Sequence, residues 1–298
     1  MAVPDWPQSF GTMDQFRTGL YDPDDPAVRW WNYTPVLAEH GHRLIGAWVG
    51  LLTLGLAAWT WFADSRRWMR WLGVGALVLV TAQGILGGLR VTENSVTMAT
   101  IHACAAQIFF ALLVGMTLFT SRSWVEGRSL LPDAPQTSTF RILTLVSVIV
   151  LYAQIVIGAL LRHLGHGIDV AFATIHIAGA FVVTGLIFAT FVYVQKHFDS
   201  FQALSRWSWA LLGLLGAQFA LGLAAYLVLI HETATAVQTN LQVALTISHL
   251  VVGGLLLAAA VGVMLLAWRT PTRADVPTAG DGVPSESVSP ARQSIPAD

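Results

Sequence analysis

Charged residues are scarce in this sequence of 298 residues. They make up 11% of the chain, where soluble globular domains carry about 25%. The basic residues do not cluster. The sixteen Lys and Arg are scattered and the formal net charge is -1, which excludes a nucleic-acid-binding surface. The one cysteine, Cys104, lies in an apolar run, which excludes a disulfide framework or a thiolate metal cluster. Any metal chemistry must therefore rest on histidines and carboxylates.

Apolar residues make up 55% of the chain and cluster in runs of about 20 or more, long enough to cross a hydrocarbon core ~30 Å thick as helices. The pattern predicts an all-α polytopic membrane bundle with seven transmembrane helices. The expected spans are about 37–62, 70–89, 97–120, 141–161, 170–194, 207–230 and 242–267. The implied organisation is a segment 1–36 outside the cytoplasm, half-bundles 37–120 and 141–268, a cytoplasmic linker 121–140 and a disordered tail 269–298.

The distribution of basic residues predicts how the chain is oriented, because Lys and Arg are retained on the cytoplasmic side of a membrane. Eleven of the sixteen fall in alternate loops or in the tail: Arg66, Arg67, Arg70, Arg122, Arg128, Arg141, Lys196, Arg206, Arg269, Arg273 and Arg292. We therefore expect a multi-pass protein of the inner (plasma) membrane, with the N-terminus as written outside and the C-terminus in the cytoplasm.

A pair of helices recurs three times along the sequence. Each copy has an Ala-Gln-x-x-x-Gly segment in one span and a histidine early in the next. The glutamines are Gln83, Gln154 and Gln218, and the histidines are His102, His176 and His249. An amide in an apolar helix is expected to hydrogen-bond a neighbouring helix. The first span stands outside this pairing, and a preceding helix would be needed to complete a fourth copy.

Four histidines recur at one depth, His42, His102, His176 and His249, each in the first two turns of an expected span. Four positions after each histidine comes a small residue on the same helix face, which would leave room for a flat ligand. These small residues are Gly46, Ala106, Ala180 and Gly253. Imidazole is an axial ligand of haem iron, and helical bundles hold haem between facing helices. The alternatives are two bis-imidazole sites, or one such site and a site for a haem substrate. The expected pairs are His42 with His102 and His176 with His249.

An isolated histidine in an apolar helix is more often a hydrogen-bonded packing residue, but four at one register of a repeat favour ligation. Glu39 precedes His42 by three residues and Arg43 by four. It could move protons at a nearby haem, or form an intrahelical pair with Arg43. Arg90 and Arg162, at the outer ends of two spans, could bind haem propionates or extend to the membrane interface.

The run Glu39-His40-Gly41-His42-Arg43 resembles the Glu-x-x-His-Arg motif of the haem A synthase family. Pro4-Asp5-Trp6-Pro7 resembles the family segment just upstream of that motif, and the Thr-Ile-His and Ser-His-Leu runs match the family's other histidine positions. The resemblance covers residues 2–268.

The resemblance implies a membrane oxidoreductase that converts haem O to haem A by oxidising the C8 methyl group to a formyl group, for biogenesis of terminal oxidases. It implies that His42 and His102 belong to the catalytic half, with Glu39 as acid/base, and that His176 and His249 hold haem b. Arg43, Arg90 and Arg162 remain candidate partners of the propionates. The expected partners are the substrate haem O, the lipid bilayer, haem O synthase, an unidentified electron acceptor and a second copy of the chain.

Family members have eight helices, and the first normally ends just before Pro-Asp-Trp-Pro, which here begins at residue 4. Either the start codon is assigned too late, which is the expected explanation, or this member lacks the span. As the sequence is written, the N-terminal haem site should be less well enclosed. The competing function is a di-haem b-type electron-transfer subunit that leaves both haems unchanged. Glu39 beside His42 favours the enzyme, because an electron carrier has little need of a carboxylate there.

Overall fold

The computed structural model describes residues 34–126, 131, 134–164, 170–231 and 239–269. Within them the chain forms seven long helices and one short helix, α4, and has no strand. The helices are α1 (Thr34–Ala63), α2 (Arg67–Thr92), α3 (Val96–Thr120), α4 (Arg122–Val125), α5 (Pro135–Leu164), α6 (Val170–His197), α7 (Gln202–His231) and α8 (Asn240–Trp268). All seven long helices are long and apolar enough to cross a membrane. The predicted all-α multi-pass bundle is confirmed, although α5 begins six residues before the expected span.

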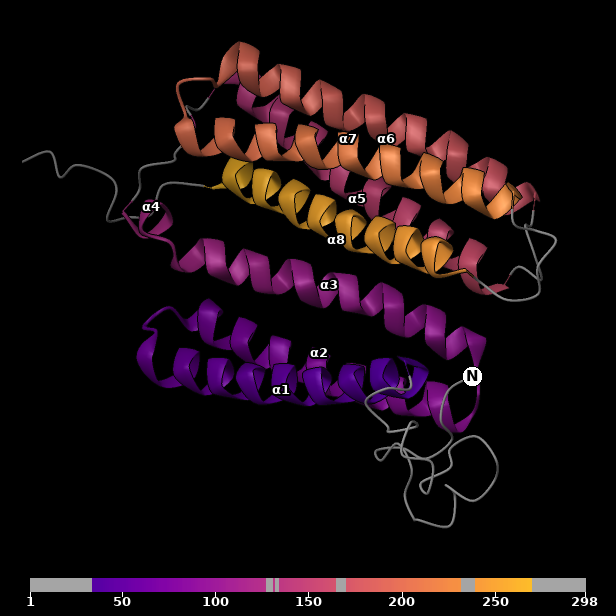
Figure 1. The fold of residues 1–298 in the computed structure, drawn as a ribbon. Helices are drawn as coiled ribbons and strands as arrows, with labels where there is room; N and C mark the ends of the chain where they lie inside the picture. The colour runs from indigo at the N-terminus through magenta and orange to yellow at the C-terminus, as the bar shows by residue number, and fades with distance from the viewer. Residues whose placement is uncertain (1–33, 127–130, 132–133, 165–169, 232–238, 270–298) are drawn as a thin grey trace, which may run out of the picture.

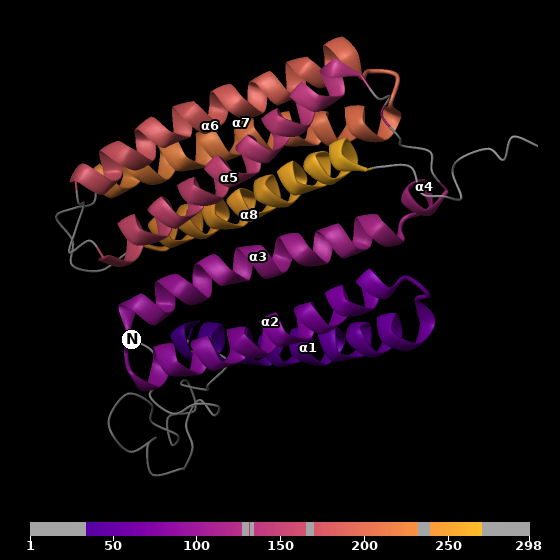
Figure 2. The same cartoon turned by 180° about the vertical axis from the view of Figure 1, so that it is seen from behind.

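The helices form two unequal halves that lie side by side (Figure 1). In the C-terminal half, α5, α6, α7 and α8 each pack against the next, and α8 returns to α5, so four helices close a ring. In the N-terminal half, α2 packs against α1 and α3, and among the described elements the backbone of α1 closely approaches that of α2 alone. Figure 2 shows α3 and α8 next to each other at the seam between the halves.

Helix α8 occupies the centre of the assembly because small residues let its neighbours approach closely. A Cβ atom added at Gly254 would fall against the side chain of Gln107 on α3, and one at Gly262 against the ring of Trp207 on α7. Gly253, Gly254 and the run Ala258–Ala260 are also buried. Small residues serve helix packing in membranes because lipid and side chains are equally apolar, so close van der Waals contact has to hold helices together.

A tight turn joins α2 to α3 and fixes where α3 begins. Asn94 adopts a left-handed conformation with φ of 47°, which Asn tolerates better than most side chains. The hydroxyl of Ser95 then accepts a hydrogen bond from the backbone N–H of Met98 and caps α3. Thr239 caps α8 in the same way through the N–H of Gln242. His102 lies seven residues after Ser95, and His249 lies ten residues after Thr239.

At the end of the bundle away from the histidines, arginine side chains donate hydrogen bonds to backbone carbonyls of helices. Arg66 donates to the carbonyl of Phe119 at 2.8 Å and forms an ion pair with Asp64. Arg141 on α5 donates to the carbonyl of Ala267 at 2.9 Å, and Arg269 donates to the carbonyl of Trp124. The first two bonds each lie within one half, and the third joins the end of α8 to α4, all at the end that the charge pattern assigns to the cytoplasm.

Candidate haem-binding site

Two pairs of histidine rings face each other, one pair in each half. The ring centres of His42 on α1 and His102 on α3 are 6.3 Å apart, with planes at 73°. Those of His176 on α6 and His249 on α8 are also 6.3 Å apart, with planes at 76°. The structure therefore pairs the histidines as the sequence predicted, at the same spacing in both halves. In the C-terminal half the two imidazoles come from α6 and α8, which lie opposite each other in the ring of four helices.

Each of the three repeated glutamines contacts the histidine on the following helix. The amide nitrogen of Gln154 donates to the His176 carbonyl at 2.6 Å and lies 3.1 Å from its Nδ1. With its amide nitrogen turned toward His102, Gln83 donates to that carbonyl at 3.1 Å and to Nδ1 at 2.8 Å. The expectation that these amides join neighbouring helices is confirmed for both.

Gln218 and His249 meet with a different geometry. The His249 Nδ1 lies 3.2 Å from the backbone carbonyl of Gln218, and Nε2 lies 3.3 Å from the side-chain nitrogen of the same residue. The Gln218 Oε1 atom is buried and has no hydrogen-bond partner among the residues that the structure describes. Gln218 thus touches both nitrogens of the ring, once through its main chain and once through its side chain.

The glycine that ends each Ala-Gln-x-x-x-Gly segment makes room for an imidazole. A Cβ atom at Gly158 would lie 2.8 Å from Cε1 of His176, and one at Gly222 would lie 2.8 Å from Cε1 of His249. At Gly87 the corresponding distance to Cε1 of His102 is 3.3 Å. Since real Cβ contacts below 3.0 Å are essentially absent, two of these positions exclude any larger side chain unless the ring moves.

The small residues four positions after the histidines differ in what lies beside them. The Cβ position of Gly253 lies 3.1 Å from the Gln218 amide nitrogen, and the Ala106 N–H lies 2.9 Å from the Gln83 amide oxygen in the orientation described above. These two positions accommodate the glutamine. Nothing lies within 4 Å of a Cβ at Gly46. The glycines on the preceding helix, one turn beyond each glutamine, are the residues that border the rings.

The geometry of the pairs fits a haem. An iron atom held by one imidazole nitrogen on each side needs ring centres roughly 6 Å apart, because such metal–nitrogen bonds are about 2 Å long. Within the described ranges, no three His, Cys, Asp or Glu side chains gather closely enough to hold a metal ion. Two imidazoles suffice for haem iron, whose other four ligands come from the macrocycle. Gly158 and Gly222, on the two helices that lie between the histidine helices, keep this cradle free of side chains.

The histidine pair of the N-terminal half is less enclosed than that of the C-terminal half. His42 is exposed, whereas His102, His176 and His249 are half-buried. The large apolar residues of α1 are exposed over much of the helix: Leu44, Ile45, Trp48, Leu51, Leu52 and Leu54. For the described residues, this agrees with the expectation of a more open N-terminal site.

The remaining predicted site residues are only partly brought together. Arg90, on α2, is close enough to interact electrostatically with both His102 and Arg162. Arg162, on α5, is thus near Arg90, and only Arg90 is near His102. Arg43 is half-buried on α1. The backbone of Glu39 belongs to α1, but its side chain lies outside the described residues, so its pairing with Arg43 or proximity to His42 is untested.

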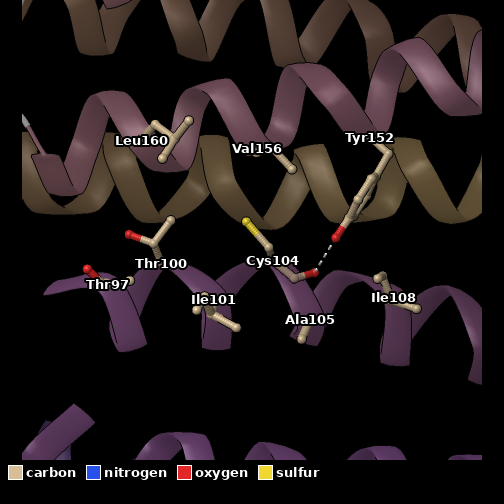
Figure 3. Close-up of a pocket in the computed structure, with 9 residues that line it drawn as sticks. All are labelled: Thr97, Thr100, Ile101, Cys104, Ala105, Ile108, Tyr152, Val156 and Leu160. Atoms are coloured by element: carbon tan, nitrogen blue, oxygen red, sulfur yellow. Dashed lines mark hydrogen bonds between the residues drawn. The ribbon is translucent and has the colours of Figure 1, made fainter. Parts of the chain in front are cut away.

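A separate hollow of about 380 Å³ lies between α3 and α5, on the seam between the halves (Figure 3). Its lining is almost entirely apolar. The Tyr152 hydroxyl donates to the backbone carbonyl of Cys104 at 3.4 Å across it, and the Cys104 side chain borders the same space. Sequence reasoning did not anticipate this hollow, because it depends on how the two halves pack.

Comparison with known proteins shows which proteins the chain is similar to. The family described as cytochrome oxidase assembly protein matches residues 32–176, a range that contains His42, His102 and His176. Over these residues the chain is similar to that family. The cytochrome oxidase assembly protein match thus includes the N-terminal histidine pair and one histidine of the other pair. The resemblance to haem A synthases, drawn from the motifs, is confirmed by relatives that carry that name.

The chain is 25% identical over 185 residues to a protein named heme A synthase from Alkalihalophilus pseudofirmus, a match that covers 61% of this chain and 54% of that protein. It is 29% identical over 164 residues to one from Exiguobacterium sibiricum, covering 54% and 49%, and 27% identical over 129 residues to one from Bacillus licheniformis, covering 43% and 42%. The matches thus span about half the length of these relatives. No solved structure matches the chain.

Proposed function

We propose that this chain is a membrane oxidoreductase of haem A biosynthesis that serves the assembly of terminal oxidases. In this proposal the substrate is haem O, and its C8 methyl group is oxidised to the formyl group of haem A. The observation that carries the proposal is the pair of histidine rings 6.3 Å apart in each half. Support comes from the family match and from the relatives named heme A synthase.

The two pairs would have different roles. His42 and His102 would hold the substrate, because this site is the more open one and Glu39 lies one helical turn before His42 in the sequence. His176 and His249 would hold haem b inside the closed ring of four helices. A haem b bound there would supply one-electron transfer.

Arginines would orient the substrate by its two carboxylates. Arg90 and Arg162 lie near each other and Arg90 lies near His102. Two neighbouring guanidinium groups repel each other unless an anion lies between them, and planar forks of N–H donors match carboxylate oxygens well. A propionate at this position would relieve the repulsion and fix the rotation of the macrocycle above the ring of His102. Arg43, one residue after His42, is the third candidate.

Glu39 would move protons during oxidation. Conversion of a methyl to a formyl group takes up an oxygen atom, here from water, and releases protons while the electrons pass to an external electron acceptor, so a carboxylate close to the reacting carbon has a direct use. The three-residue spacing places Glu39 and His42 on one side of α1. The carboxylate would then share a side of the helix with the imidazole that would hold the substrate.

The test is to express the full chain together with a source of haem O, extract the haem and search for the formyl product by mass spectrometry. The proposal predicts haem A in the wild-type sample. A protein that binds two haems and returns haem O unchanged would instead be a di-haem electron carrier.

Replacement of Glu39 by Ala separates catalysis from structure. The expected result is loss of turnover with the haem content preserved, because the histidines remain. Loss of haem together with turnover would assign Glu39 a structural role.

A further inference from the structure

Three amide side chains at the same position of the sequence repeat lie beside three of the four histidines. Gln83, Gln154 and Gln218 come from α2, α5 and α7, and each touches the histidine of the next repeat helix. Gln83 and Gln154 are buried, at 8% exposure each. A buried amide is costly in an apolar helix unless its hydrogen bonds are satisfied. Recurrence at all three positions therefore points to a contribution that outweighs this cost.

Helix association alone does not account for Gln218. Its buried Oε1 has no hydrogen-bond partner in the described part of the chain, whereas its nitrogen lies beside the ring of His249. A residue selected only to join helices would not leave a buried acceptor unsatisfied, because the unmade bond costs about 1–3 kcal/mol. The contact with the imidazole is what distinguishes this amide from an ordinary packing residue.

The chemistry of a metal-binding imidazole explains why an amide is suitable. When one ring nitrogen binds a metal, the other carries the proton and needs an acceptor, and this bond sets the tautomer, the ring orientation and the basicity of the ligand. An amide is neutral and can either donate to or accept from a ring nitrogen. It can therefore hold the ring both before and after a metal binds, without adding a charge to the apolar helix.

Two other glutamines in the spans provide a comparison. The amide oxygen of Gln107, on α3, faces Gly254 of α8, and the amide nitrogen of Gln195, on α6, donates to the Ser208 hydroxyl at 2.9 Å. Both join helices, and neither hydrogen-bonds a histidine within the described ranges. Amides therefore have two separate uses here, and only those of the repeat meet an imidazole.

We infer that Gln83, Gln154 and Gln218 are positioning residues that orient His102, His176 and His249 and tune their strength as ligands. The inference rests on the proposed function, since it requires that these histidines bind haem iron. It assigns the glutamines a role in haem affinity and reduction potential in addition to helix packing. His42 is exposed and lies outside this set of three.

The test compares two substitutions of Gln154 with the same substitutions of Gln107, in the full chain loaded with haem. Gln154→Leu removes both hydrogen-bonding atoms, and the expected loss of haem affinity at the C-terminal pair is about 10- to 100-fold. Gln154→Glu keeps the shape and offers a negatively charged acceptor, which makes the imidazole more basic and should lower the midpoint potential of one haem. Gln107→Leu and Gln107→Glu should leave haem affinity and both potentials unchanged.

The outcomes separate the inference from the function on which it rests. If the wild-type chain binds no haem, the proposed function fails. If it binds two haems, and the Gln154 variants match the Gln107 variants in affinity and potential, the glutamines are packing residues and the inference is wrong. Should Gln154→Leu fail to fold, the potential of Gln154→Glu and the affinity of Gln83→Leu at the N-terminal pair decide the question.

Discussion

Replacement of Gly222 by alanine is expected to damage the C-terminal histidine pair through a single added methyl group. The new Cβ would lie 2.8 Å from Cε1 and 3.2 Å from Nδ1 of His249, so the ring has to turn away. Overpacking of this kind costs about 1–3 kcal/mol. Because each 1.4 kcal/mol changes an equilibrium constant tenfold, haem affinity at this pair should fall by roughly 5- to 150-fold.

Two further glycines make this prediction specific. Nothing lies within 4 Å of a Cβ at Gly216, on the same helix, so Gly216→Ala should keep full haem affinity and stabilise α7 by up to about 1 kcal/mol. A Cβ at Gly87 would lie 3.3 Å from Cε1 of His102. Gly87→Ala should therefore have an effect on the N-terminal pair that is smaller than the effect of Gly222→Ala on the other.

The assay is a haem titration of the purified full chain in detergent, followed by the Soret absorbance, with thermal unfolding measured on the same samples. The reasoning would be refuted if Gly222→Ala and Gly216→Ala bound haem equally well. Equal loss in both variants would also refute it, because the effect would then reflect the helix and not the contact with the ring.

Two predictions concern parts of the fold away from the histidines. The hydrogen bond from Arg66 holds the pKa of Asp64 below its usual range, so the ion pair stabilises the fold above about pH 3.9 and this contribution fades as pH falls through the lowered pKa. In Asp64→Asn the free energy of unfolding, measured between pH 3 and 7, should lose this pH-dependent contribution, which is worth up to about 1 kcal/mol. An unchanged pH profile would contradict this. The Ser147 and Thr190 hydroxyls lie 3.2 Å apart between α5 and α6. Thr190→Val should therefore lower the free energy of unfolding in detergent by about 1 kcal/mol. Ser147→Ala should then lower it less in the Thr190→Val variant than in the wild-type chain. Additive losses would show that the two hydroxyls do not interact.

Much of the fold and the pairing of the histidines could be predicted from the sequence. Hydropathy located the seven membrane helices, because each must bury its backbone hydrogen bonds within one continuous apolar run. The repeat gave the common depth of the histidines, and alternate helix directions placed His42 with His102 and His176 with His249. The contacts of Gln83 and Gln154 followed from the cost of an unpaired amide in an apolar helix.

The features that escaped prediction depend on the rotation of each helix about its axis. The pattern could not show that Gly158 and Gly222 border the imidazoles while Gly253 borders a glutamine, because all three are small residues near the same depth. Nor could it identify α8 as the central helix, since every span is apolar and hydropathy does not distinguish a lipid neighbour from a helix neighbour. Only the packing of the two halves created the hollow beside Cys104.

The central claim is that the two histidine pairs bind iron, and electron paramagnetic resonance of the haem-loaded full chain tests it most directly. The account predicts two low-spin ferric signals per chain, one of which disappears in His176→Ala while the other persists. A single signal in the wild-type chain, or two signals that both survive His176→Ala, would contradict it.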